Sequence, residues 1–315
     1  MNIVIVTPAA AGSRHGNRNT AARWAALLRN LGHRVRVQVA WDGAPADAMF
    51  ALHARRSHDS VARYALAFPE RPLVLALTGT DLYRDIRHDV NAQESMELAS
   101  RMVVLQEMGL MELAPRLRAK TRVIYQSAPR ITPHQPLRHC FEVVVSGHLR
   151  EEKDPFRTAA ALAHLPRDSR IRVTHIGGAM SPEMARAAGA WAGREPRYRW
   201  LGELSHGKAL RILARSRLMV VSSRMEGGAN VVSEALAIGV PVIASRIPGN
   251  IGMLGPRYAG YYPVADERAL AGLLWRTESD RGFYRKLRTL CRVRRGLVAP
   301  RREREGLKHL LAEID

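Results

Sequence analysis

The stretch IVIVTPAAAGSRHGNRNTAARWAALL, residues 3–28, predicts how the fold begins. Residues 3–6 form a short continuous apolar run, and the polar loop of residues 8–20 follows it. The next apolar residues recur at the spacing of one helix face, and they are Ala21, Trp24, Ala25 and Leu28. This order predicts a buried strand, a loop large enough to surround a phosphate, and a helix.

The rest of the first half repeats the alternation of strand and helix. Gly32 is expected to end the first helix, and Val35, Val37 and Val39 alternate as in a second strand. Further apolar runs, separated by helical patterns, cover residues 49–52, 73–77 and 102–105. Strands separated by helices form parallel sheets, so a doubly wound α/β domain is predicted here.

A proline-rich segment divides the chain in two. It contains Pro129, Pro133 and Pro136, which disfavour both a helix and a central strand. After it, strand candidates follow at residues 141–145, 171–176, 198–201, 219–221 and 240–244. The predicted parts are a domain at 1–128, a linker at 129–140, a second domain at 141–297 and a basic helix at 298–315. We expect two Rossmann-like domains facing a cleft, with function in the loops that follow strands.

The chain of 315 residues is strongly basic. Its formal net charge is +20 and its pI is near 11.1, which favours an anionic partner. The arginines are spread along the chain, aromatic residues make up only 6%, and no zinc-ligand or RNP-type cluster accompanies them. A phosphate-bearing small ligand is therefore predicted ahead of nucleic acid, and the nucleic-acid-binding alternative depends on the arginine-rich tail.

Cysteine content and hydropathy indicate the compartment. Cys140 and Cys291 are too few for a disulfide framework or a thiolate metal site. No basic signal region precedes the first apolar run, and no run approaches about 18 apolar residues. We expect a cytoplasmic protein without membrane insertion.

The stretch RMEGGANVVSEALAIGVPVIAS in the second domain carries the clearest chemistry. Glu226 and Glu234 are separated by seven residues, Gly227 and Gly228 follow the first glutamate, and a helix is predicted from about Asn230. Glycines let backbone N–H groups at a helix N-terminus approach a phosphate, and glutamates accept hydrogen bonds from sugar hydroxyls. The pattern fits a nucleotide sugar, although the spacing alone is equally typical of a glycine-rich turn with two surface glutamates.

This pattern resembles the GT-B glycosyltransferases, especially the large retaining group whose two glutamates are separated by seven residues. The resemblance covers both predicted domains and is strongest over residues 141–245, where EALAIGVPVIAS also matches in residue type. It implies that Glu226 contacts hydroxyls of the donor sugar and that Glu234 holds the ribose. The other residues of this stretch that it implies in donor binding are Gly227, Gly228, Asn230 and Val231.

The loop after the first strand of the second domain, VVVSGHLREEKDP, carries cations. Members of the family place an arginine after the glycine and a lysine five residues further on, and both neutralise the donor diphosphate. Lys153 matches the lysine, whereas His148 stands at the arginine position and Arg150 lies two residues later. We expect Arg150 to share the cation role and His148 to donate a hydrogen bond in the donor site. Without the resemblance, Lys153 and Arg150 would be interpreted as surface charge.

The implied mechanism uses these cations in place of a metal ion. The diphosphate gains negative charge as it leaves, so Lys153, Arg150 and Glu226 are the expected catalytic residues. No Asp-x-Asp pair follows a strand, and we expect neither a metal nor a cofactor, with the UDP-sugar as a substrate. Gly178, shortly after the predicted strand at 171–176, is expected to let the backbone approach the nucleoside.

Loops that follow strands of the first domain are expected to bind the acceptor. Those with arginine or histidine cover residues 13–20, 53–59 and 78–85. The backbone amides of Gly16 and Asn17, with Arg18 beside them, suit an anion at a helix N-terminus. Thr80 is expected to add a hydroxyl contact, and Asp81 to cap the following turn or bind a sugar hydroxyl. Many related glycosyltransferases carry a histidine in the third loop, where this chain has TGTD.

Five segments together resemble a narrower family, the selenosugar synthases of bacterial selenoneine biosynthesis. They are GNRNTAARWA, LHARRS, LTGTDLY, SGHLREEKDP and SRMEGGANVVSEA. Members join a UDP-sugar, UDP-N-acetylglucosamine, to the selenium of selenophosphate, so the resemblance implies an anionic acceptor and a carbon–selenium bond. A glycosyltransferase for another small acceptor is the alternative, and a dinucleotide-dependent oxidoreductase is disfavoured because no G-x-G-x-x-G follows the first strand. The anomeric outcome and the oligomeric state stay open.

Overall fold

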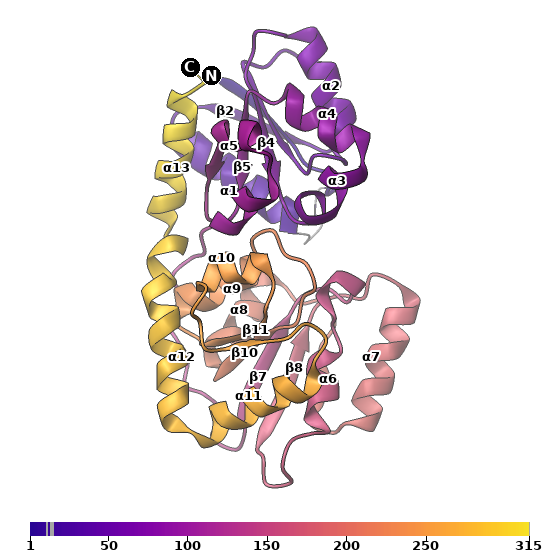
Figure 1. The fold of residues 1–315 in the computed structure, drawn as a ribbon, viewed down its shortest axis with the longest axis vertical. Coiled ribbons are helices and arrows are strands. Elements are labelled where there is room, and N and C mark those ends of the chain that lie inside the picture. The colour runs from indigo at the N-terminus through magenta and orange to yellow at the C-terminus, as the bar shows by residue number, and fades with distance from the viewer. Residues whose placement is uncertain (11, 13–15, 315) are drawn as a thin grey trace. The chain divides into compact units, whose positions relative to one another are not determined.

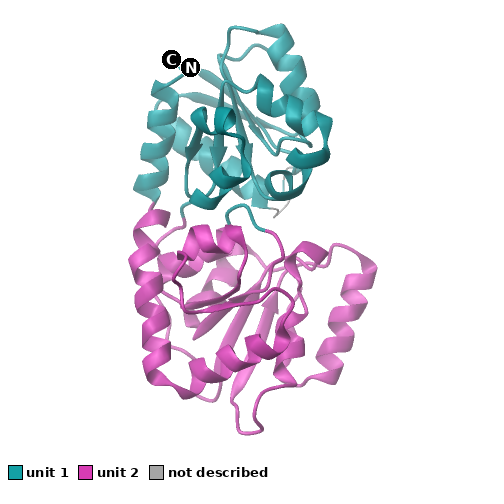
Figure 2. Ribbon diagram, viewed as in Figure 1, with its two compact units in different colours: residues 1–127, 226–228, 300–315 teal, residues 128–225, 229–299 magenta. Residues whose placement is uncertain are grey.

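The computed structural model describes residues 1–10, 12 and 16–314. The chain divides into two compact units, which Figure 2 colours separately. The first unit contains residues 1–127, 226–228 and 300–315, and the second contains residues 128–225 and 229–299. Each unit is built on one parallel sheet with helices, which confirms the predicted fold class of two Rossmann-like α/β domains.

The sheet of the first unit has six strands in the order β2-β1-β3-β4-β5-β6, and every neighbouring pair is parallel. The strands are β1 Asn2–Val6, β2 Arg34–Gln38, β3 Ala48–Leu52, β4 Leu73–Leu77, β5 Arg101–Val104 and β6 Thr121–Val123. The first five overlap the predicted strands, although Val39 lies beyond the end of β2. The sequence analysis missed β6 because its three residues, TRV, form no apolar run.

The helical segments of the first unit connect these strands (Figure 1). They are α1 Gly16–Asn30, α2 His58–Ala67, the π-helical turn η1 Asp81–Asp85, α3 Ile86–His88, α4 Val90–Leu98, η2 Glu107–Glu112, α5 Pro115–Ala119 and α13 Pro300–Ala312. As predicted, α1 ends just before Gly32, whose φ of +94° is a left-handed conformation that glycine adopts without strain.

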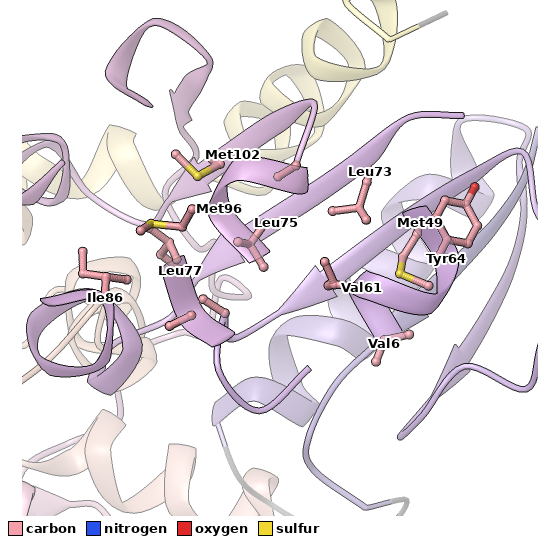
Figure 3. Packing of buried hydrophobic residues seen from close by; sticks show 14 of the residues in the cluster. Val6, Met49, Val61, Tyr64, Leu73, Leu75, Leu77, Ile86, Met96 and Met102 are labelled. Carbon is pink, nitrogen blue, oxygen red and sulfur yellow. The ribbon is translucent and has the colours of Figure 1, made fainter. Parts of the chain in front are cut away.

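Two apolar clusters cover the two faces of this sheet, because successive side chains of a strand point to opposite faces. Ile3 and Ile5 of β1 pack with α1 and α13, whereas Val4 and Val6 pack with α2 and α4. Figure 3 shows the second cluster, in which side chains of β3 and β4 meet Val61 of α2. The strands are therefore buried on both sides, and only their ends and loops are available for function.

A buried glutamate ties the last helix into the first unit. Glu303 of α13 is completely buried and accepts hydrogen bonds from Arg23 Nε (2.9 Å) and Trp24 Nε1 (2.9 Å) of α1. Its carboxylate also accepts the backbone N–H of Ser127 at 2.9 Å. The predicted basic tail helix is therefore a packed element of the first unit, with Leu307 and Leu310 in the core.

The sheet of the second unit also has six parallel strands, in the order β12-β11-β10-β7-β8-β9. They are β7 Phe141–Ser146, β8 Ile171–Ile176, β9 Tyr198–Trp200, β10 Leu218–Val221, β11 Val242–Ser245 and β12 Tyr261–Tyr262. The first five were predicted, and the two-residue β12 was not. Residues 129–137, within the predicted linker, contain neither helix nor strand.

Helical segments follow the strands of the second unit. They are η3 Glu151–Lys153, α6 Arg157–Leu162, α7 Pro182–Arg194, α8 His206–Arg215, α9 Asn230–Ile238, α10 Pro248–Leu254, α11 Glu267–Ser279, α12 Arg281–Arg294 and η4 Arg295–Val298. In the described part of the chain, no helix is long and apolar enough to cross a membrane.

Candidate active site

Two glycine-containing loops lie side by side at the carboxyl edge of the second sheet. One follows β7 and the other follows β8. The Gly147 N–H donates to the carbonyl of Ile176 at 2.8 Å, and the Leu149 N–H donates to that of Gly178 at 2.9 Å. Two predicted donor-binding residues, His148 and Gly178, are therefore held in adjacent loops.

Gly177 allows these loops to approach so closely. Its φ is +150°, and a Cβ at this position would lie 1.9 Å from the carbonyl oxygen of Gly147. At Gly178 a Cβ would only reach van der Waals contact with Glu203 and His148. The backbone at Gly177 can thus be occupied by glycine alone, and this strict requirement falls on Gly177 and not on the predicted Gly178.

His148 packs against the second of these loops. Its Nδ1 accepts the Gly178 N–H at 3.2 Å. Because a backbone N–H can only donate, Nδ1 is unprotonated in this geometry and the ring hydrogen is on Nε2. This tautomer has the N–H that the predicted role of His148 as a hydrogen-bond donor requires, and the role itself stays a prediction.

The cation-bearing turn η3 is fixed from β10. The Ser222 hydroxyl lies 2.9 Å from the carbonyls of both Lys153 and Asp154, and the Arg224 N–H donates to the Glu152 carbonyl at 2.8 Å. The Lys153 side chain runs past Gly147, with its Cδ 3.9 Å from where a Cβ of that glycine would be. The structure thus brings Lys153 to the glycine loops, while Arg150 is exposed at the start of the turn.

Glu234 lies on α9, which begins at Asn230 as predicted and carries Val231 in its first turn. Its Oε1 is 2.8 Å from Nε2 of His206, the first residue of α8. The Glu234 side chain is 16% exposed and that of His206 is 61% exposed. Sequence reasoning missed His206 because only the packing of α8 beside α9 brings it to the glutamate.

The other end of the glutamate motif belongs to the first unit. Glu226 is buried, and Gly227 and Gly228 follow it in the same compact unit as residues 1–127. A Cβ at Gly227 would lie 2.3 Å from the Thr78 carbonyl oxygen, and one at Gly228 would lie 2.6 Å from Cβ of Leu105. Both glycines are therefore needed for close packing against the loops after β4 and β5.

The first predicted acceptor group lies at the start of α1. Gly16, Asn17 and Arg18 form its first turn, and the Thr20 hydroxyl donates to the Gly16 carbonyl at 3.0 Å. Residues 13–15 of the same predicted loop lie outside the described residues.

Asp81 holds the loop after β4 together. Its carboxylate is completely buried and accepts the N–H groups of Thr78 (2.9 Å), Gly79 (2.8 Å) and Ala54 (3.0 Å). The three N–H groups belong to residues that precede Asp81, so the carboxylate fixes the loop before it and, contrary to the prediction, does not cap the following turn. Thr80, by contrast, is partly exposed next to it.

A histidine from the second loop reaches the third. His53 Nε2 lies 3.0 Å from the Thr80 hydroxyl oxygen, and His53 itself has a φ of +77°, which is uncommon for a residue with a side chain. Burial lowers the pKa of His53, although the carboxylates of Asp81 and Asp85 oppose that shift. Sequence reasoning treated the loop with His53 separately and did not pair it with Thr80.

A metal site is not evident in the chemistry of these loops. Within residues 1–10, 12 and 16–314, no group of three or more His, Cys, Asp or Glu side chains is arranged to hold a metal ion.

Several solved structures share the fold across almost the whole chain. HepE of Anabaena, solved in complex with UDP, has a TM-score of 0.80 at 16% identity and covers 99% of this chain and 100% of its own. Sucrose-phosphate synthase of Thermosynechococcus elongatus has a TM-score of 0.79 at 16% identity, covering 99% and 98%. A glycosyltransferase of Rickettsia africae has a TM-score of 0.75 at 14% identity, covering 99% and 98%.

Sequence comparison adds a family to this fold. A search of curated proteins gave no match. The family model described as glycosyl transferases group 1 matches residues 139–290, just under half of the chain. This region contains the glycine loops, the η3 turn and both glutamates of the motif. Residues 139–290 thus match the model of the glycosyl transferases group 1 family, and almost the whole chain shares the GT-B fold with the solved structures.

Proposed function

We propose that this chain is a group 1 glycosyltransferase that takes its sugar from a UDP-sugar, UDP-N-acetylglucosamine or a similar one, and transfers it to the selenium of selenophosphate in the cytoplasm. The observation that carries the donor half is the family match over residues 139–290, which includes Lys153, Glu226 and Glu234. The acceptor half is supported by the resemblance of five sequence segments to selenosugar synthases.

The donor assignment is supported by the chemistry of the glycine loops. Close backbone approach at Gly147 and Gly177, with the Lys153 side chain beside them, suits a diphosphate. HepE, which shares the fold, was solved with UDP and with UDP-glucose. We propose Glu234 as the ribose ligand, which requires that it exchange its contact with His206 for a sugar hydroxyl.

The proposed reaction forms a bond between the anomeric carbon and selenium. The bond from that carbon to the diphosphate oxygen breaks, and its electron pair leaves with UDP. Fixed cations at Lys153 and Arg150 stabilise the charge that grows on the leaving group, and Glu226 contacts the sugar hydroxyls. We propose that these cations make a metal ion unnecessary.

The acceptor proposal depends on nucleophile chemistry. An alcohol needs a base within about 3 Å of its hydroxyl, whereas the selenium of selenophosphate is already anionic at neutral pH. Such an acceptor needs mainly an anion site. We propose Gly16, Asn17 and Arg18 at the N-terminus of α1 for it, with Thr80 of the first unit as a further contact.

The test is mass spectrometry of products from a panel of UDP-sugars with selenophosphate, thiophosphate and neutral alcohols, with EDTA present or absent. We expect a selenium–sugar product and UDP, unaffected by EDTA, and strong loss of turnover in Lys153→Ala, by about 100- to 1000-fold. Faster glycosylation of an alcohol would refute the selenium acceptor and leave a glycosyltransferase for another acceptor. No product from any UDP-sugar would refute the donor.

A further inference from the structure

The centre of the second sheet contains a histidine that the proposed chemistry does not use. His175 lies on β8, one residue before the strand ends, and it is only 1% exposed. Its Nδ1 is 2.8 Å from the hydroxyl of Tyr198 on β9, and its Nε2 is 3.3 Å from the carbonyl oxygen of Gly147. Both nitrogens therefore have a partner in the interior.

The partners determine where the protons are. Burial lowers the pKa of His175 to about 4, so the ring is neutral at neutral pH and carries a single N–H. A carbonyl can only accept, so that hydrogen is on Nε2 and points to Gly147. Nδ1 is then an acceptor, and the Tyr198 hydroxyl must donate to it.

The carbonyl that His175 holds belongs to the glycine in the middle of the diphosphate loop. Gly147 lies against Gly177, and Cδ of Lys153 is 3.9 Å from where a Cβ of Gly147 would be. The Gly177 carbonyl is held in the same manner, by Nε1–H of Trp200 at 2.8 Å. Two aromatic N–H groups from neighbouring strands thus fix the carbonyls of both glycine loops.

Fixing a carbonyl fixes the whole peptide plane. No cis peptide occurs among the described residues, so the N–H of His148 points away from the Gly147 carbonyl and from His175. The Gly147 carbonyl oxygen also lies against Gly177, where a Cβ would be only 1.9 Å from it. The imidazole therefore determines the direction in which the loop backbone faces its ligand.

We propose that His175, oriented by Tyr198, is a positioning residue for the donor: it holds the Gly147–His148 peptide in the conformation that binds the diphosphate of a nucleotide sugar. This inference rests on the proposed UDP-sugar donor. A leucine or valine at the same place would fill the core equally well but would leave the Gly147 carbonyl without a donor and the loop free to rotate.

The experiment compares UDP affinity, measured by titration calorimetry, with thermal stability in five full-length proteins. His175→Phe removes the N–H that donates to the Gly147 carbonyl. Tyr198→Phe removes only the hydroxyl that orients the His175 ring, and His175→Gln restores an N–H near the Nε2 position. Thr174→Val is the matched control, because Thr174 is the preceding residue of β8 and its hydroxyl donates to Glu142 at 3.0 Å.

We expect His175→Phe to bind UDP about tenfold more weakly, which is about 1.4 kcal/mol. Tyr198→Phe should lose about two- to fivefold, and His175→Gln should return to within about twofold of the wild type. Thr174→Val should melt earlier, as His175→Phe does, while its UDP affinity stays within about twofold of the wild type.

The outcomes separate this inference from the proposed donor. A wild type that fails to bind UDP refutes the donor proposal. If the wild type binds UDP and His175→Phe binds it equally well, the positioning role alone is refuted. Equal losses of affinity in Thr174→Val and His175→Phe also refute it, because the loss would follow stability. If His175→Phe does not fold, Tyr198→Phe decides, and nitrogen NMR of the wild type must show the Nε2–H tautomer.

Discussion

Both units fix a loop at the end of a strand with a buried side chain, but they use opposite chemistry. After β4, the acidic side chain of Asp81 accepts three backbone N–H groups of its surroundings. After β7, the neutral ring of His175 donates to the backbone carbonyl of Gly147. One loop is held through its N–H groups and the other through its oxygen.

This difference suits the two loops to different ligands. A carboxylate buried beneath a loop repels an anion that binds to the outer side of that loop, and it occupies the N–H groups that would hold one. A neutral ring adds no negative charge. The loops after β7 and β8 are therefore the better place for a diphosphate, whereas in the first unit an anionic acceptor is better placed at α1 than at the loop with Asp81.

The largest expected effect comes from blocking the close approach of the loops after β7 and β8. Gly177→Ala places a Cβ 1.9 Å from a backbone oxygen, and we expect a loss of more than about 4 kcal/mol in the free energy of unfolding, or no soluble protein. The control is Gly189→Ala on α7, where nothing lies within 4 Å and a gain of about 0.5–1 kcal/mol is expected. Equal stability of the two variants in urea unfolding would contradict this.

The buried, neutral His175 should make the free energy of unfolding decrease in acid. The pKa of His175 is about 4 in the fold and near its ordinary value of 6.5 when unfolded, so the unfolded chain binds the proton first. Stability is therefore complete above pH 6.5 and decreases as the pH falls toward 4, by about 3 kcal/mol. Urea unfolding of the wild type and His175→Gln across this range should show a loss that is about 3 kcal/mol larger in the wild type. Parallel curves would mean that His175 is not held neutral.

The loop held by the buried Asp81 carboxylate should lose stability when one acceptor oxygen is removed. Asp81→Asn replaces an oxygen that accepts an N–H by a second donor, and we expect the free energy of unfolding to fall by about 2 kcal/mol. Asp47→Asn is the comparison, since Asp47 is exposed and accepts the Asn2 N–H, and about 0.5 kcal/mol or less is expected there. A loss in Asp81→Asn no larger than that of the control would remove the contrast between the two loops.

The smallest effect concerns the contact between His206 and Glu234, which lies outside the two loops held by Asp81 and His175. His206 is largely exposed, so His206→Ala should change the free energy of unfolding by less than about 0.5 kcal/mol. It should also leave the KM for the UDP-sugar within about twofold, whereas Glu234→Ala should raise that KM because a ribose contact is lost. A clear rise in KM in His206→Ala would assign the nucleoside contact to the histidine.

The sequence predicted the sheets well because continuous apolar runs are the direct signature of strands buried on both faces. The runs that became β1, β3 and β4 are all of this kind. β6 and β12 were not predicted, because strands of three and two residues are too short to show a periodic or apolar pattern. The start of α9 at Asn230 was likewise predicted, because glycines and small residues precede it in the sequence.

The candidate site was predicted as a set of loops, but not as a set of contacts. His53, His175 and His206 each meet a partner 23–28 residues away in the chain, and nothing local marks them. His175 even interrupts an apolar strand pattern and was counted only as part of a strand. Side-chain partners across strands and helices depend on packing, which periodicity does not specify.

The hydrogen bonds to the buried Glu303 carboxylate have a consequence for the order in which the nascent chain folds. Glu303 lies 279 residues after Trp24 and 176 after Ser127, so both donors leave the ribosome long before their acceptor is made. All residues of the second unit, 128–225 and 229–299, are translated in that interval. The half of the protein that is synthesised first is therefore the half that is completed last.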